Sequence, residues 1–219
     1  MIKKILFGSK DKMKSAYLWN TCAAMLNAFQ TVFILMLISR IDPVIDAGVF
    51  TIAFAIGNLM MAIGKYGIRQ FQVSDVEEKY SFKEYTVARI ITSIIMIAAS
   101  FVYVGVNLAS GLYDSSKSIV IILICLAKVI DAVEDVIHGM FQQYLRLDVA
   151  GKILSIRMCT YIFVYLVCYY FSKNLILTSA VALLVSFIQF VILNYTAIRG
   201  FEIKKKTFEI KNVKNIFVE

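Results

Sequence analysis

Residues 90–97 read IITSIIMI, and this run decides the class of fold. A strand of a membrane barrel alternates polar with apolar side chains over about 10 residues, which this run does not do. The run belongs to a longer apolar stretch, 87–110. Inside lipid, a backbone satisfies its amide and carbonyl groups only in a helix or a closed barrel. The stretch is therefore predicted to be a transmembrane helix.

Five further stretches resemble the first, and each is long enough to cross a membrane or nearly so. About 20 apolar residues span a hydrocarbon core of about 30 Å. The sequence predicts an all-α integral membrane protein, with a six-transmembrane-helix bundle at 15–198. A basic N-terminus, 1–14, and a basic tail, 199–219, flank it. The predicted spans are 15–39, 48–66, 87–110, 118–138, 153–172 and 175–198.

The basic residues indicate how the spans are oriented. Most of the 23 lysines and arginines precede the first span, surround the connections after the second and fourth spans, or follow the sixth. The opposite connections hold only Arg40, Lys117 and Lys173. The positive-inside rule then places both termini in the cytoplasm, with short outer loops. The net charge of +8 is explained by this topology and by attraction to anionic lipid, so no nucleic-acid partner is expected.

Several functional classes lack their usual sequence features. His138 is the only histidine, and there is no zinc-protease, P-loop, dinucleotide-binding or serine-nucleophile motif. The four cysteines all lie in predicted spans without a C-x-x-C spacing, which favours buried apolar side chains over a metal or disulfide framework. We expect neither an enzyme nor a metal or organic cofactor.

Polar residues inside the fourth span are the main functional signal. They follow one another at helical spacing, so they share one stripe of the helix. One interpretation is structural: Lys128 and Asp131 form an ion pair that holds helices together. The other is a hydrated cavity wall, which the number of polar groups favours, because a lone charge at the bilayer centre costs at least about 2.5–3.5 kcal/mol. The stripe comprises Lys128, Asp131, Asp135, His138, Gln142 and Arg146.

Weaker polar signals lie in the first two spans. Asn27 and Gln30 share a broad face of the first helix, and Asn58 lies midway along the second. Each of these side chains is suited to hydrogen bonds between helices. Gly57 and Gly64 predict that the second helix packs closely against a neighbour.

Two parts of the sequence resemble a known family. The run 46–55, DAGVFTIAFA, and its continuation 58–70, NLMMAIGKYGIRQ, are similar to the second helix of polysaccharide flippases. Asp135 followed by Gly139, Gln142, Gln143 and Arg146 resembles the end of the family's fourth helix. These are O-antigen and capsular flippases of the multidrug/oligosaccharidyl-lipid/polysaccharide exporter superfamily.

The resemblance implies membrane transport in bacterial surface polysaccharide biosynthesis. Such a protein moves an undecaprenyl-pyrophosphate-linked oligosaccharide across the cytoplasmic membrane by alternating access. Lys128 would hold the anionic headgroup, and Asp131 would be its partner or a site for a coupling cation, H⁺ or Na⁺. Asp135 and His138 are further coupling-ion candidates. Arg69 and Arg146 would lie at the cytoplasmic mouth, and the carboxamides would bind sugar hydroxyls: Asn27, Gln30 and Asn58.

The chain departs from the family in its number of helices. Family members have twelve or more in two six-helix lobes, and this chain has one lobe. We expect a truncated product, or a half transporter that pairs with itself or with a second lobe. The Lys128 stripe is then expected to be open to water unless a second lobe covers it. Two alternatives are a cation-coupled drug or metabolite antiporter lobe, and a non-transporting membrane partner of a glycan-assembly complex.

Overall fold

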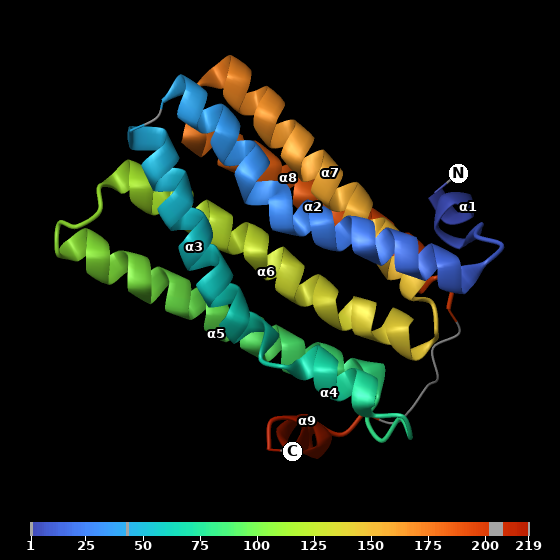
Figure 1. Cartoon of the computed structure of the whole chain (residues 1–219). Helices are drawn as coiled ribbons and strands as arrows, with labels where there is room; N and C mark the ends of the chain where they lie inside the picture. The colour runs from blue at the N-terminus through green and yellow to red at the C-terminus, as the bar shows by residue number, and fades with distance from the viewer. Residues whose placement is uncertain (1, 43, 202–207, 219) are drawn as a thin grey trace.

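The computed structural model describes residues 2–42, 44–201 and 208–218. Every regular element in these residues is a helix and none is a strand, so the predicted all-α class is confirmed. Residue 1 of the predicted N-terminus and residues 202–207 and 219 of the predicted tail lie outside the described residues. The helices are α1 (Ile2–Phe7), α2 (Lys12–Ile41), α3 (Ile45–Lys65), α4 (Ile68–Ser74), α5 (Phe82–Ala109), α6 (Ser115–Gln143), α7 (Leu147–Ser172), α8 (Leu175–Ile198) and α9 (Ile210–Ile216) (Figure 1).

Five membrane spans are supported by length and composition. They are α2, α3 with α4, α5, α7 and α8. Five such helices are the mark of a multi-pass membrane protein. The helix α6 corresponds to the fourth predicted span, but its apolar run is interrupted by charges at Lys128, Asp131, Glu134 and Asp135. The membrane-spanning role of α6 therefore stays a prediction.

The helices α2, α5 and α6 begin a few residues before the apolar stretches that predicted them, and polar side chains cap their first turns. The Asp11 carboxylate accepts a hydrogen bond from the Lys14 amide at 3.0 Å. Ser81 and Glu84 form a capping box at the start of α5. Asp114 and Asn174 cap α6 and α8. Such caps satisfy amides that have no partner within the helix.

The helix α6 occupies the centre of the bundle and packs against α3, α5, α7 and α8. Its closest neighbour is α3, where two glycines allow the backbones to approach. A Cβ atom on Gly57 would lie 3.1 Å from Ile124, and one on Gly64 would lie 2.6 Å from the Met96 sulfur and 3.2 Å from Ala132. The sequence prediction of a close-packing face on this helix is confirmed. By contrast, α2 packs mainly on α7 at the edge of the bundle.

The second predicted span, 48–66, ends where the backbone leaves the helix α3. Tyr66 and Gly67 both adopt left-handed backbone conformations, with φ of 38° and 67°. The chain then continues as the short helix α4, which contacts α6. This break places α4 against α6, on the lower side of the bundle in Figure 1.

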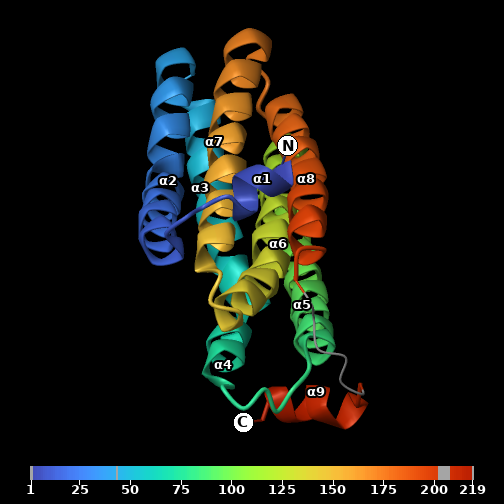
Figure 2. The same cartoon turned by 90° about the vertical axis from the view of Figure 1, so that its right-hand side faces the viewer.

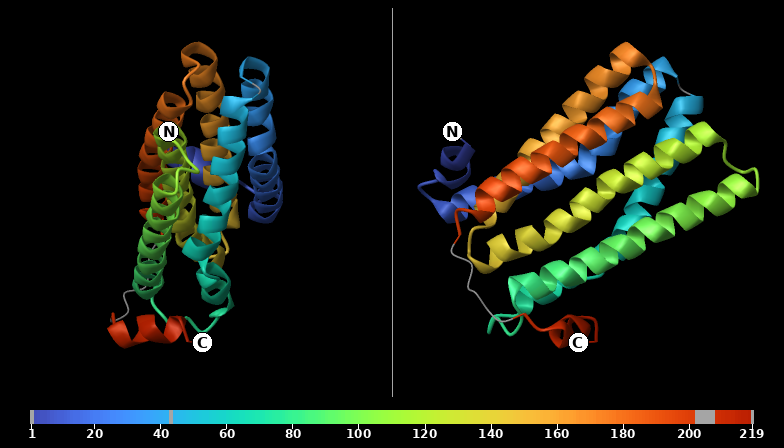
Figure 3. Two further views of the ribbon diagram at one scale, coloured as in Figure 1. Left: turned by 90° about the vertical axis from the view of Figure 1, so that its left-hand side faces the viewer. Right: turned by 180° about the vertical axis from the view of Figure 1, so that it is seen from behind.

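The two ends of the bundle differ in charge. We call the end that holds both chain termini the basic end, and Figures 2 and 3 show α9 lying across it beneath α4 and α5. Glu84 anchors α9: one carboxylate oxygen accepts hydrogen bonds from the Glu209 amide at 3.0 Å and from the Asn212 side chain at 2.8 Å. The opposite end carries the connections 110–114 and 173–174.

Candidate functional site

A buried network of charged and polar side chains joins α6 to α7 and α8. Arg157 on α7 is its centre: its guanidinium contacts Asp131 at 2.5 Å and donates to Glu134 at 3.0 Å and to the Ser186 hydroxyl at 3.0 Å. The Asn194 amide donates to the other Glu134 oxygen at 2.8 Å. We call this group the mid-bundle network: Lys128, Asp131, Glu134, Arg157, Ser186 and Asn194.

Lys128 completes the network. Its ammonium lies 3.5 Å from Asp131 and 4.3 Å from the centre of the Phe54 ring. The predicted Lys128–Asp131 ion pair is therefore present, and Arg157 and Glu134 extend it. Two cations face two carboxylates, so the network carries no net charge. Such pairing offsets the cost of placing charges at mid-depth in a membrane.

The mid-bundle network is closed rather than open to water. Lys128 is only 4% exposed in the single chain, so the expectation of an open stripe that awaits a second lobe is wrong for this residue. Helices of the same chain cover it, with Phe54 of α3 against its ammonium. The adjoining cavity, which Gln30 and Tyr161 help to line, measures about 10 Å³. That volume holds about one water molecule.

A second group gathers on Asp135 at the basic end. Its carboxylate forms ion pairs with the guanidinium groups of Arg69 on α4 at 3.3 Å and Arg89 on α5 at 3.0 Å, and with the Lys65 ammonium on α3 at 3.9 Å. We call these four residues the basic cluster. Three cations share one carboxylate, which leaves a surplus of two positive charges. The side chains of Lys65 and Arg69 are 41% and 29% exposed, whereas Arg89 is fully buried.

Arg89 links the basic cluster to the break between α3 and α4. Its guanidinium donates to the carbonyl oxygens of Gly64 at 2.7 Å and Lys65 at 2.6 Å, at the end of α3. The Thr92 hydroxyl donates to the same Gly64 oxygen at 2.7 Å. Carbonyls at a helix end have no partner within the helix, so this arginine caps α3 while it holds Asp135.

The remaining residues of the predicted stripe, His138, Gln142 and Arg146, do not form one group. His138 is buried and lies 4.0 Å from Glu134, and its Nε2 has no hydrogen-bond partner among the described residues. Gln142 accepts a hydrogen bond from Arg69 at 3.1 Å and so joins the basic cluster. Arg146 lies beyond the end of α6 and pairs with Asp148 at 2.8 Å. It lies in a different group from Arg69, the other residue predicted at the mouth.

The three carboxamides predicted to bind sugar are not brought together. Gln30 is buried beside Lys128 and Asp131, and its side-chain oxygen has no partner among the described residues. Asn27 and Asn58 are exposed on the outer surfaces of α2 and α3.

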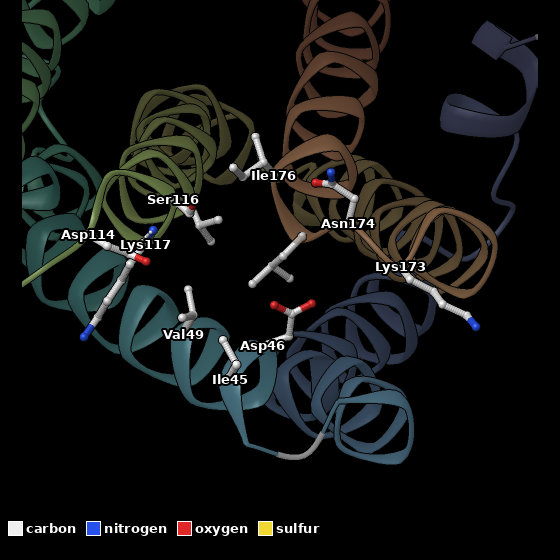
Figure 4. Close-up of a pocket in the computed structure, with 11 residues that line it drawn as sticks. Ile45, Asp46, Val49, Asp114, Ser116, Lys117, Lys173, Asn174 and Ile176 are labelled. Carbon is white, nitrogen blue, oxygen red and sulfur yellow. Dashed lines mark hydrogen bonds between the residues drawn. The ribbon is translucent and has the colours of Figure 1, made fainter.

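A cavity of about 260 Å³ lies at the opposite end, between α3, α6 and α8. Its lining includes Asp46, Asp114, Ser116, Lys117 and Asn174. Figure 4 shows the Asp46 carboxylate turned toward the start of α8, while the Lys173 side chain extends away. No residue of this cavity was among the predicted site residues.

Arg157 and Arg89 are the two central residues that the sequence analysis missed, because both lie near predicted span boundaries and were counted as cytoplasmic positive charge. The signal that identifies them is the upstream start of each helix, which places both arginines well inside it. Among the described residues, no group of histidine, cysteine and acidic side chains is arranged to hold a metal ion. Neither protein-family models nor curated proteins gave a match to this chain.

Proposed function

We propose that this chain is one six-helix lobe of a flippase that moves undecaprenyl-pyrophosphate-linked oligosaccharide across the bacterial cytoplasmic membrane. The observation that carries the proposal is the basic cluster, where Lys65, Arg69 and Arg89 share the single carboxylate of Asp135. A diphosphate headgroup is an anion that such a surplus of cations attracts.

The exposure of Lys65 and Arg69 and the burial of Arg89 support this assignment. The exposed fractions of Lys65 and Arg69 leave their charged groups accessible, while the buried Arg89 keeps Asp135 in place. A ligand phosphate is therefore able to recruit two cations without leaving the carboxylate unpaired. In this proposal the basic end faces the cytoplasm, as the charge distribution predicts. The headgroup then meets the cluster on the side where the lipid-linked sugar is made.

The mid-bundle network has a supporting role in the proposal. Its charges are paired and covered, which fits a rigid joint between α6, α7 and α8 better than a direct headgroup site. The proposed contacts of the headgroup are therefore Lys65 and Arg69, and not Lys128. Transport by alternating access also needs a second wall, so we propose that the lobe works with a second lobe or a second copy of itself.

A second candidate function is a cation-coupled antiporter lobe. It is favoured by Asp131, whose side chain is 16% exposed beside a cavity of about one water molecule lined by Gln30 and Tyr161. Here a proton or Na⁺ would bind at Asp131, and the basic cluster would only set the topology. A scaffold that does not transport is the third possibility, and it requires neither site.

The test is complementation of a flippase-null bacterial strain by the chain together with a candidate second lobe, with surface glycan as the readout. The double variant Lys65→Gln, Arg69→Gln should reduce glycan at least tenfold. Lys83→Gln is the matched control, because this lysine lies at the same end outside the cluster. Full glycan from the double variant would refute the headgroup assignment. No glycan from the unmodified chain, together with proton- or Na⁺-coupled drug efflux that depends on Asp131, would favour the antiporter.

Binding can be measured apart from transport. Native mass spectrometry of the purified lobe in nanodiscs should retain undecaprenyl pyrophosphate in preference to uncharged undecaprenol, and the double variant should lose this preference. Equal retention of the two lipids would contradict a diphosphate site.

A further inference from the structure

The cavity at the opposite end is lined by both polar and apolar side chains. The polar groups include Asp46 at the start of α3, Ser116 on α6 and Asn174 before α8. Aliphatic side chains of Val49, Val120, Leu175 and Ile176 complete the lining. A concave site with a few convergent polar groups among apolar walls is the usual form of a small-ligand pocket.

The charged residues of the lining are Asp46, Asp114, Lys117 and Lys173, and the Asp46 carboxylate is turned into the cavity (Figure 4). One of its oxygens accepts a hydrogen bond from the buried Tyr169 hydroxyl at 2.7 Å, which fixes the carboxylate. Within the described part of the chain Asp46 makes no ion pair. The nearby Lys117 ammonium instead lies 4.1 Å from the Tyr113 ring centre, and Lys173 extends away (Figure 4). The cavity therefore offers a fixed acceptor that no cation neutralises.

Size and charge restrict the ligand. The cavity measures about 260 Å³, far more than a bare metal ion needs. Among the described residues, no group of three or more histidine, cysteine and acidic side chains is arranged to hold a metal ion. An anionic ligand would be repelled by the unpaired carboxylate. A neutral ring with hydroxyl groups fits: its hydroxyls donate to Asp46, and its C–H face packs on the aliphatic wall.

We propose that this cavity binds one neutral sugar ring, at the end of the lobe opposite the basic cluster. The choice of a sugar over another neutral polyol rests on the proposed function. If the flippase proposal holds, the ring belongs to the oligosaccharide and the cavity holds it on the outer side of the membrane. The cavity and the basic cluster share no residue, so each can fail without the other.

The test is saturation-transfer NMR on the purified chain in nanodiscs, with galactose, glucose and N-acetylglucosamine as neutral probes and glucuronate as the anionic one. At least one neutral sugar should give transfer signals, and glucuronate should give weaker ones. Asp46→Asn should weaken sugar binding at least tenfold, while the carboxamide oxygen of this variant still accepts the Tyr169 hydrogen bond. Asn174→Ser, which keeps a helix cap, should also weaken binding. Arg40→Gln, in the last turn of α2 and outside the lining of this cavity, should bind as the unmodified chain does.

Three outcomes would overturn the proposal: no neutral sugar binds, glucuronate binds more tightly, or Asp46→Asn binds like the unmodified chain. Sugar binding with full dependence on Asp46, but without glycan transport, would support the cavity and refute the flippase. A melting temperature of Asp46→Asn within a few degrees of the unmodified chain shows that the loss is local.

Discussion

At the scale of single residues, Arg157 holds the mid-bundle network together, because among the described residues it alone donates hydrogen bonds to both Asp131 and Glu134. We predict that Arg157→Met destabilises the chain by about 3–5 kcal/mol, since it leaves two buried carboxylates with one lysine. Thermal unfolding in detergent measures the loss. Arg199→Met is the control: this arginine lies at the end of α8, outside the network, and its removal should cost at most about 1 kcal/mol. Equal effects of the two variants would contradict a central role for Arg157.

The pair Lys128 and Asp131 gives a second prediction at this scale. Lys128→Ala and Asp131→Ala should each lower stability and impair transport by the complete transporter. Asp131→Ala removes the counter-charge of Lys128, and Lys128→Ala removes one of the two cations that face Asp131. The double variant should lose less than the sum of the single variants, which a double-mutant cycle measures. Strict additivity in unfolding would show that the two charges act independently. Single variants that restore glycan fully would limit the pair to a structural role.

At the scale of helices, the break between α3 and α4 depends on backbone conformation. A Cβ atom on Gly67 would meet no other atom, so Gly67→Ala tests φ alone. We predict a loss of about 1–2 kcal/mol, because L-residues disfavour the left-handed region. Gly105→Ala is the matched control: it too has open space around it, but in an ordinary helix, where alanine should raise stability by about 0.5–1 kcal/mol. Unfolding measurements should show a loss of stability for Gly67→Ala and a gain for Gly105→Ala. A change of the same sign in both variants would contradict the left-handed conformation of Gly67.

The attachment of α9 makes a second prediction for helices. Glu84→Ala removes the acceptor for Glu209 and Asn212, so the amides of 210–216 should exchange hydrogen faster. The exposed Glu77, changed to alanine, is the control and should leave that exchange unaltered. Unchanged protection in Glu84→Ala would mean that the apolar contacts of Val213 and Ile216 suffice.

At the scale of the whole molecule, the prediction is topology. Asp114 and Asn174 line the same cavity. Lys79 lies in the connection between α4 and α5, and Gln143 ends α6. Figure 1 shows α4 toward the other end of the bundle. Reporter fusions after Asp114 and Asn174 should therefore show an external location, and fusions after Lys79 and Gln143 a cytoplasmic one. Reversal at any two of these positions would overturn the orientation.

The long helices followed from the sequence because hydrophobicity over about 20 residues is a local property. Their starts did not, since they depend on polar caps such as Ser81 that hydropathy ignores. The site was harder to predict, because charge partners are distant in sequence: Arg89 and Asp135 are 46 residues apart. The rotation of α2 about its axis likewise decides that Gln30 is buried and Asn27 is not. Spacing along one helix contains no information on that rotation.

The charges of α6 also affect how the protein is made. A charged residue at the centre of a helix raises the free energy of partition from the translocon by about 2.5–3.5 kcal/mol, and α6 holds several. Its neutralising arginine arrives later in synthesis, on α7, and its hydrogen-bonding partners later still, on α8. We therefore expect α6 to remain beside the translocon until α7 and α8 emerge. The last three long helices would then enter the bilayer as one unit.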